Sequence, residues 1–215
     1  MKVFILCAGE ARRFGGTLKQ LLKIGDTTIL GRQIEQLKKY KVSPIIVTLN
    51  PETKGYAESL GASVISPPLQ TSGATETILF TRPWWDERTI ILLGDVIFSN
   101  IILNAVMTQP GDIRVFGHKF EIFATSFNEP VYEDVVAALE RTRKIPHWPR
   151  GKVRYFYHEY IGIPYNTPWK PGVPPEKEIA YYVNCNITRD VDSLEFYQQA
   201  IRQLITSGAL ARDRP

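Results

Sequence analysis

The first residues that could do chemistry lie in a glycine-rich loop behind the apolar run 3–8. The loop 9–16 carries Arg13, and Lys19 follows three residues later. Glycines let the main chain approach a ligand closely, with amides directed at anionic oxygens. Arg13 can hold a phosphate through two parallel hydrogen bonds, while Lys19 acts as a point charge. This segment predicts a triphosphate cradle; the alternative is a plain glycine turn with solvated basic residues.

Two common phosphate-binding motifs do not describe this loop. No Gly-Lys-Ser/Thr follows the glycines, so the segment is not a Walker loop. The dinucleotide fingerprint also fails, because Ala11 stands where its second glycine is needed. A phosphate cradle here must therefore be of another kind.

The second candidate is the carboxylate of Asp95, which follows the apolar run 89–93 and Gly94. A carboxylate at the end of a strand is exposed at the edge of the sheet, where it can hold a hard divalent cation. The alternative is an aspartate that forms a turn or caps a helix, which is common.

These residues need a framework that brings them to one edge. Apolar runs alternate with amphipathic segments through the first hundred residues. This alternation predicts βαβ units and a mostly parallel mixed sheet with helices on both faces, a three-layer α/β/α sandwich. Ligands in such sheets bind at the carboxyl ends of the strands, where the glycine loop and Asp95 fall. The expected strands are 3–8, 44–49, 62–65, 89–93, 113–116, 122–125 and 181–186. The expected helices are 28–40, 53–60, 74–81, 131–144 and 193–207.

Composition and charge narrow the class of protein. The 215 residues are ordinary in composition, which predicts one globular domain, 1–215. The net charge of +4 suits a phosphate-bearing ligand but is too small to require nucleic acid. The apolar start stops at Gly9, which is too short for a secretory leader or a membrane span. Since Cys7 and Cys185 form no disulfide framework, we expect a cytoplasmic protein without a membrane partner.

Several segments, in this order and spacing, resemble the nucleotidyltransferase superfamily. The residues 6–15 and 19–22 are similar to its signature, which usually reads Leu-Ala-Ala-Gly, then Arg, then Pro-Lys-x-Leu. The segment 92–96 resembles its metal-binding aspartate segment, and 184–191 resembles its late segment. The family includes sugar-phosphate nucleotidyltransferases, isoprenoid cytidylyltransferases and molybdenum cofactor guanylyltransferases. The resemblance implies a nucleotide-diphospho-sugar transferase-like fold of the GT-A type.

The signature also departs from the family. Ala11 and Arg12 replace the common Gly-Ser/Thr, and Leu18 replaces the proline before Lys19. Only five residues separate Arg13 from Lys19. This spacing resembles that of the cytidylyl- and guanylyl-transferring enzymes rather than the longer loop of the thymidylyltransferases.

The resemblance implies a specific set of site residues. The catalytic residues would be Arg13, Lys19 and Asp95. The metal, Mg²⁺, would be held by Asp95 and Asn186, with Asn184 the other candidate for the second ligand. The nucleotide-binding residues would be Leu6, Ala8, Gly9, Glu10, Arg13, Lys19, Thr71, Ser72, Gly73 and Ala74. The acceptor would contact Lys119, Glu121 and Asn184.

The implied activity is Mg²⁺-dependent transfer of a nucleoside monophosphate from a nucleoside triphosphate to a small phosphorylated acceptor, above all a sugar phosphate, with release of pyrophosphate. Residues 1–100 would form the nucleotide-binding half, and 101–215 the acceptor-binding half with an irregular segment at 145–175. No nucleic acid or membrane is expected as a partner, and a homodimer stays open. Cys7 is expected to be a small buried residue, not a nucleophile.

Two other functions stay open. A glycosyltransferase would use a ready-made sugar nucleotide on the same fold, although no Asp-x-Asp follows the run 89–93. A non-catalytic nucleotide-binding or regulatory domain would bind the triphosphate without releasing pyrophosphate. Trp148 and Trp169 could stack on a sugar or base, or else cover the core or a dimer contact. His158 and Glu159 could bind a metal, or be structural.

Overall fold

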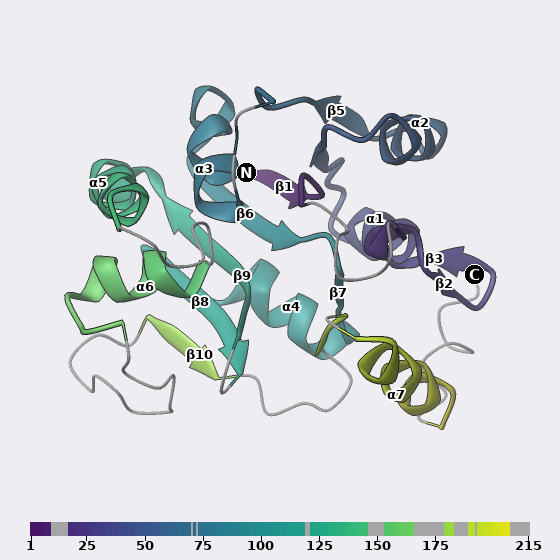
Figure 1. Cartoon of the computed structure of the whole chain (residues 1–215). Coiled ribbons are helices and arrows are strands. Elements are labelled where there is room, and N and C mark those ends of the chain that lie inside the picture. The colour runs from purple at the N-terminus through teal and green to yellow at the C-terminus, as the bar shows by residue number, and fades with distance from the viewer. Residues whose placement is uncertain are drawn as a thin grey trace.

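The structure is a computed structural model of the chain, and it describes residues 1–9, 17–69, 71, 73–118, 121–145, 153–165, 179–182, 189–191 and 193–206. Figure 1 shows how its elements are arranged. The strands are β1 (Lys2–Leu6), β2 (Lys23–Ile24), β3 (Thr27–Thr28), β4 (Ile45–Val47), β5 (Ser63–Ile65), β6 (Arg88–Leu93), β7 (Val96–Ile97), β8 (Ile113–His118), β9 (Glu121–Asn128), β10 (Ala180–Tyr182) and β11 (Arg189–Asp190). The α-helices are α1 (Ile29–Lys38), α2 (Pro51–Ser59), α3 (Ala74–Phe80), α4 (Asn100–Thr108), α5 (Tyr132–Arg143), α6 (Val153–Ile161) and α7 (Leu194–Thr206). Short 3₁₀ helices are η2 (Lys19–Leu21), η3 (Arg82–Trp84) and η4 (Glu129–Val131).

One mixed sheet organises the molecule. Its described strands have the order β10-β8-β9-β6-β1-β4-β5. Strand β9 runs antiparallel to its neighbours β6 and β8, whereas the other neighbouring strands pair in parallel. The predicted fold class, an α/β protein with a mostly parallel mixed sheet, is therefore confirmed.

Helices cover both faces of this sheet and complete three layers. On one face α1, α2 and α4 build an apolar core, and on the other α3, α5 and α6 build a second one (Figure 1). In strand β1, Val3 and Ile5 belong to the first core, while Phe4 and Leu6 belong to the second. Because successive side chains of a strand point to opposite faces, a central strand covered on both sides must be apolar throughout.

Capping side chains set where the first two α-helices begin. The Thr28 hydroxyl accepts a hydrogen bond from the Gly31 amide at 2.9 Å and begins α1. The Asn50 side chain accepts one from the Thr53 amide at 3.0 Å and begins α2 at Pro51, two residues before the predicted start. A proline fits the first helical position because the donor it lacks has no helical partner there.

Two helices form where the sequence predicts none. Helix α4 follows Ser99, whose hydroxyl accepts a hydrogen bond from the Ile102 amide at 3.3 Å. Helix α6 lies inside the segment 145–175, which was expected to be irregular. The four consecutive residues 155–158 of α6 are all buried. Burial on several sides removes the apolar and polar period from which a helix is predicted.

The predicted strands of the second half are confirmed in part. The strands expected at 113–116 and 122–125 are present and longer, as β8 and β9. The strand expected at 181–186 overlaps β10, but residues 183–188 lie outside the described residues. Within the described parts of the chain, no helix combines the length and the apolar character needed to cross a membrane.

The C-terminal part of the chain returns to the N-terminal half. Strand β11 pairs antiparallel with β7, which follows the turn 94–95 after β6. Helix α7 then packs Ala200 and Leu204 against Ile24 in a third apolar core. This return brings residues 189–191 beside the turn that carries Asp95.

Candidate functional site

A cavity of about 200 Å³ lies at the carboxyl ends of β1 and β6. We call it the carboxyl-edge cavity. It is lined by Leu6, Cys7, Ala8, Gly9, Lys19, Gln20, Gly73, Ala74, Thr77, Leu93 and Asp95. Its position is the one predicted for a ligand site in a parallel sheet, because the loops after the strands meet at that edge.

The cavity brings Lys19 and Asp95 together. The Lys19 ammonium lies 3.4 Å from an Asp95 carboxylate oxygen, in a hydrogen-bonded ion pair. The Lys19 side chain is 14% exposed and that of Asp95 is 31% exposed. An ammonium and a carboxylate with partial access to solvent can both still reach a ligand in the cavity.

Close packing of the main chain holds the turn before Asp95. The Gly94 amide donates to the Leu6 carbonyl at 2.9 Å. A β-carbon at Gly94 would lie 2.3 Å from the Cys7 sulfur and 2.9 Å from the Leu6 carbonyl oxygen. Position 94 therefore has no room for a side chain. Burial, and then the charge of Asp95, raise the pKa of the Cys7 thiol above its usual range, which keeps that thiol neutral.

The end of β1 opens into the cavity. The Cys7 amide donates to the Val47 carbonyl at 2.8 Å, and the Thr48 hydroxyl donates to the Cys7 carbonyl at 3.2 Å. These bonds tie the end of β1 to β4 and the residue after it. Among the described residues, none would lie within 4 Å of a β-carbon at Gly9. Ala8 and Gly9 both line the cavity, where a ligand could approach their main chain.

The opposite wall comes from the start of α3. Gly73 precedes this helix with a φ of +87°, a backbone conformation that favours glycine. Its carbonyl accepts from the Thr77 hydroxyl at 2.9 Å, so Thr77 faces this helix start. Gly73 and Ala74 line the cavity, whereas the described residue Thr71 does not.

The remaining predicted site residues fall into two groups. Glu121 begins β9, the strand next to β6, but it does not line the carboxyl-edge cavity. The predicted residues that lie outside the described residues are Glu10, Arg13, Ser72, Lys119, Asn184 and Asn186.

The late segment nevertheless reaches the turn that carries Asp95. The Val191 amide donates to the Asp95 carbonyl at 3.0 Å, and β11 pairs with β7 immediately beside it. The resemblance predicted a metal ligand from this part of the chain. The strand pairing places 189–191, the described residues of that segment, beside the turn, while the ligand itself stays a prediction.

Some residues of the cavity were missed at the level of sequence. Gln20 is 6% exposed, lines the cavity and donates to the Thr53 hydroxyl at 2.8 Å. Thr77 lines the opposite wall. A polar side chain directly after Lys19 was the available signal for Gln20. Thr77 carried none, because its role depends on how α3 is placed against β1.

The pair His158 and Glu159 does not form a metal site in this structure. His158 is fully buried, and burial followed by the charge of Arg154 lowers its pKa to about 4. Glu159 accepts from the Arg141 guanidinium at 2.8 Å and from the Tyr165 hydroxyl. The Glu159 carboxylate is thus engaged by Arg141 and Tyr165 and His158 is enclosed, which supports the structural alternative. Within the described residues, no three His, Cys, Asp or Glu side chains gather as a metal-binding group.

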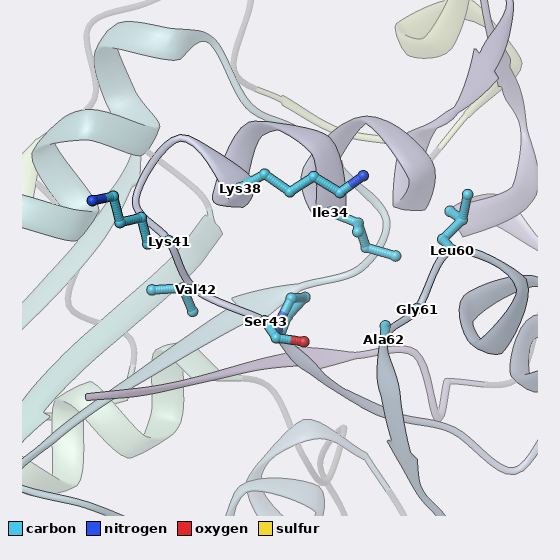
Figure 2. Close-up of a pocket in the computed structure, with 9 residues that line it drawn as sticks. Ile34, Lys38, Lys41, Val42, Ser43, Leu60, Gly61 and Ala62 are labelled. Atoms are coloured by element: carbon cyan, nitrogen blue, oxygen red, sulfur yellow. The ribbon is translucent and has the colours of Figure 1, made fainter.

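A second hollow, of about 300 Å³, lies at the amino ends of β4 and β5 (Figure 2). We call it the amino-edge hollow. It is lined by Ile34, Lys38, Lys41, Val42, Ser43, Pro44, Leu60, Gly61 and Ala62. Lys38 pairs with Glu35 at 2.7 Å, and in Figure 2 Lys41 points away from Leu60. Lys38 is thus paired with a carboxylate on its own helix, whereas Lys19 in the carboxyl-edge cavity is paired with Asp95 from a distant part of the chain.

Comparison with known proteins agrees with this architecture. The family described as the MobA-like NTP transferase domain matches residues 3–151. A CTP:phosphocholine cytidylyltransferase from Streptococcus pneumoniae is similar in structure, with a TM-score of 0.63 and 13% identity over 94% of this chain and 98% of that one. The inositol-1-phosphate CTP transferase from T. maritima gives a TM-score of 0.63 and 10% identity, over 96% of each chain. A UDP-glucose pyrophosphorylase complexed with UDP-glucose gives 0.61 and 12%, over 96% of this chain and 98% of that one. No curated protein matches the sequence.

Proposed function

Because the chain belongs to the MobA-like NTP transferase domain family, we propose that this nucleotidyltransferase moves a nucleoside monophosphate from a nucleoside triphosphate to a small phosphorylated acceptor, with release of pyrophosphate. The observation that carries the proposal is the pair of Lys19 and Asp95 in the carboxyl-edge cavity. One cation and one carboxylate meet there, beside the main chain of Ala8 and Gly9. The ammonium is the group needed for phosphate recognition, and the carboxylate is the group needed for cation binding.

The chemistry of the cavity is compatible with Mg²⁺. The ion is commonly held by one or two carboxylates together with phosphate oxygens of the substrate and water. Asp95 offers one carboxylate that is still in part exposed, and the pairing of β11 with β7 supports a second ligand from the late segment. Asp95 and Asn186 are the residues proposed to hold the ion, with Asn184 as the other candidate for the second ligand. When bound, Mg²⁺ would neutralise the α-phosphate and orient its oxygens.

The residues of the chain act on the charge that develops during transfer. An oxygen of the acceptor attacks the α-phosphorus, a new P–O bond forms, and the bond to the bridging oxygen breaks as pyrophosphate leaves in line. Lys19 and Arg13 would hold the oxygens of the leaving pyrophosphate, where negative charge grows. In the free protein Lys19 is paired with Asp95 at 3.4 Å, so binding of the triphosphate would shift its ammonium toward the phosphates.

The nucleoside would lie against the main chain at the end of β1. The place of Gly9 in the cavity lining and the wall at Gly73 and Ala74 support this orientation. Leu6 and Thr77 also line the cavity, beside Gly9, Gly73 and Ala74. The cavity would thus hold the nucleoside by shape, and the triphosphate would extend toward Lys19 and Asp95.

The acceptor is proposed to be a small molecule that carries a phosphate, with a sugar phosphate as the favoured class. The names of the similar structures support the phosphate: phosphocholine, inositol-1-phosphate and UDP-glucose. Lys119, Glu121 and Asn184 stay the proposed contacts. A glycosyltransferase is less well supported, because the buried Ile97 of β7 stands where an Asp-x-Asp that began at Asp95 would have its second carboxylate.

Pyrophosphate release tests the proposal directly. The protein is incubated with Mg²⁺, each nucleoside triphosphate in turn, and a panel of sugar, polyol and choline phosphates. We expect release with one triphosphate and one acceptor, and its loss with chelator or in Asp95→Asn. Triphosphate binding without release for any pair would favour the non-catalytic alternative. Release of a nucleoside diphosphate from a sugar nucleotide would favour the glycosyltransferase.

Two further expectations from the sequence stay predictions. A homodimer is tested by light scattering of the purified protein. A cytoplasmic location is tested by fractionating cells that express the full chain.

A further inference from the structure

We infer that Gln33 is a positioning residue that holds the turn carrying Asp95, an inference that rests on the proposed nucleotidyl transfer. Gln33 lies in the middle of α1 and is 1% exposed. Its side-chain nitrogen donates to the Leu93 carbonyl at 3.0 Å and to the Val96 carbonyl at 2.7 Å. These carbonyls stand on either side of Gly94 and Asp95. One amide group therefore clamps both ends of the turn.

The orientation of this amide follows from its partners. Both partners are carbonyl oxygens, so only the nitrogen of the amide can bond to them. The Gln33 side-chain oxygen is buried and finds no partner within the described part of the chain. A leucine would fill this position without an unpaired amide oxygen, but it would remove the donor to both carbonyls. The contribution of Gln33 therefore lies in the two bonds that its nitrogen donates.

Main-chain hydrogen bonds hold the same turn from other directions. The Gly94 amide donates to Leu6 on β1, and the Val191 amide donates to the carbonyl of Asp95. Neither bond spans the bend between β6 and β7, whereas the two bonds of Gln33 do. A carboxylate that holds a metal must keep its place within a fraction of an ångström. The two hydrogen bonds of Gln33 supply the constraint across this bend that the main-chain hydrogen bonds do not.

Helix α1 also supports the lysine of the cavity. It contacts η2, the short helix that begins at Lys19. The Ile29 amide at the start of α1 donates to the Leu22 carbonyl at 3.0 Å, directly after η2. One helix therefore sets the positions of both Lys19 and the Asp95 turn. This places Gln33 where a small shift would change the geometry of the whole pair.

Gln36 offers a matched control on the same helix. Its nitrogen donates to the Phe98 carbonyl at 3.2 Å and to the Asn100 side-chain oxygen at 2.7 Å. It is 3% exposed, and its own oxygen is likewise buried without a partner in the described residues. Its targets lie beyond β7, away from Asp95. The two glutamines thus lose equivalent bonds on substitution, but only Gln33 supports the turn.

The experiment compares Gln33→Met with Gln36→Met. Pyrophosphate release is measured with varied triphosphate and varied Mg²⁺. For Gln33→Met we expect kcat to fall by about 10- to 100-fold, the Mg²⁺ needed for half-maximal rate to rise, and KM for the triphosphate to change little. For Gln36→Met we expect kcat within about threefold of the wild type. Hydrogen exchange without substrate should be faster at 93–97 in Gln33→Met only.

A second variant uses pH to separate positioning from general destabilisation. In Gln33→Glu the carboxyl group can donate to one carbonyl only while it is protonated. We expect its kcat, relative to that of the wild type, to rise as the pH is lowered. Because an ionised carboxylate buried here would also destabilise the fold, the profile is compared only over the pH range in which thermal unfolding shows that the variant is folded. If Gln33→Met fails to fold, this profile and the exchange at 93–97 in Gln33→Glu decide the question.

Each outcome has one meaning. Equal kinetic effects in Gln33→Met and Gln36→Met, or unchanged exchange at 93–97, would overturn the positioning role. A wild-type protein that releases no pyrophosphate with any pair of substrates would contradict the proposed function instead. Exchange at 93–97 would still report whether Gln33 holds the turn, so the two failures can be told apart.

Discussion

Lys19 and Asp95 meet at 3.4 Å in the carboxyl-edge cavity, whereas Lys38 and Glu35 meet at 2.7 Å beside the amino-edge hollow. The closer pair lies one turn apart on a single helix, with side chains 56% and 66% exposed. The wider pair joins residues 76 positions apart, in a part-buried setting. Water screens an exposed pair, and a helix brings its members together whatever the fold. A candidate site is therefore distinguished from a surface contact by the burial of its side chains and by how far apart its residues lie in the sequence. The distance between the charged atoms does not distinguish the two.

The two edges of the sheet also differ in their main chain. Helices α1 and α2 end near the amino-edge hollow, and a helix C-terminus carries a partial negative charge that disfavours anions. At the other edge, the chain after β1 lines the cavity with Ala8 and Gly9. The same residue type, lysine, thus has an anion-binding setting at one edge only. Four predictions test this contrast, from the largest effect to the smallest.

Replacing the carboxylate of each pair should give the largest difference. We expect Asp95→Asn to lower kcat for pyrophosphate release by about 10³-fold or more, since the proposed metal loses its anionic ligand. Glu35→Gln should leave kcat unchanged. Thermal unfolding of both variants checks that the fold is retained. Near-normal turnover of Asp95→Asn with Mg²⁺ present would remove the metal assignment.

Replacing the lysine of each pair comes next. We expect Lys19→Met to lower kcat/KM for the triphosphate by about 10²-fold, the loss of one electrostatic group at the leaving pyrophosphate. Lys38→Met keeps a similar aliphatic stem in the amino-edge hollow and should leave kcat/KM unchanged. Steady-state kinetics with varied triphosphate measures both. A similar loss in the two variants would mean that the edges do not differ as argued.

Glycines at the two edges should respond differently. In Gly94→Ala the new β-carbon meets the Cys7 sulfur and the Leu6 carbonyl, so we expect a loss of stability of about 1–3 kcal/mol and a lower kcat. Gly61 has open space but a φ of +79°, so Gly61→Ala should cost about 1–2 kcal/mol through the backbone alone. Urea unfolding measures the loss of stability in each variant. The kcat at saturating substrate measures the additional effect of Gly94→Ala on turnover. A normal kcat for Gly94→Ala would show that the turn tolerates displacement.

The smallest effect concerns the surface pair itself. We expect the double variant Glu35→Gln/Lys38→Met to change the free energy of unfolding by about 0.5 kcal/mol or less, as exposed pairs on a helix do. Urea unfolding at low and moderate salt measures it. A loss well above 1 kcal/mol would show that exposure underestimates what this pair contributes.

Part of the candidate site could be predicted from the sequence, because the signals for that part lie in neighbouring residues. Lys19 follows a glycine loop, and Asp95 follows an apolar strand, so both could be predicted as strand-end residues. Gln20 and Gln33 were not found, since their partners lie 33 or more positions away. A polar side chain on the apolar face of a helix was the available signal for Gln33, but its targets depend on how α1 packs on β6 and β7.

The helices likewise divide into those that neighbouring residues predict and those that depend on tertiary packing. The period of α1 and its threonine cap are written in neighbouring residues, and the predicted range 28–40 contains the observed helix. Helix α6 is buried on several sides, so the segment 145–175 lacks the polar face that a helix pattern requires. Its aromatic residues were therefore interpreted as irregular chain. Packing between layers, not local preference, makes residues 153–161 helical.

By itself the sequence determined the α/β class, the central apolar strand at the N-terminus, and Lys19 and Asp95 as residues of the segments that follow two apolar strands. Short-range patterns suffice for these features, because strand and helix periods repeat within a few residues. The tertiary structure alone decided that Lys19 meets Asp95, that β11 returns to pair beside the same turn, and that Gln33 clamps it. Such contacts join residues tens of positions apart, and only the packing of α1 and β11 against the sheet brings them within bonding distance.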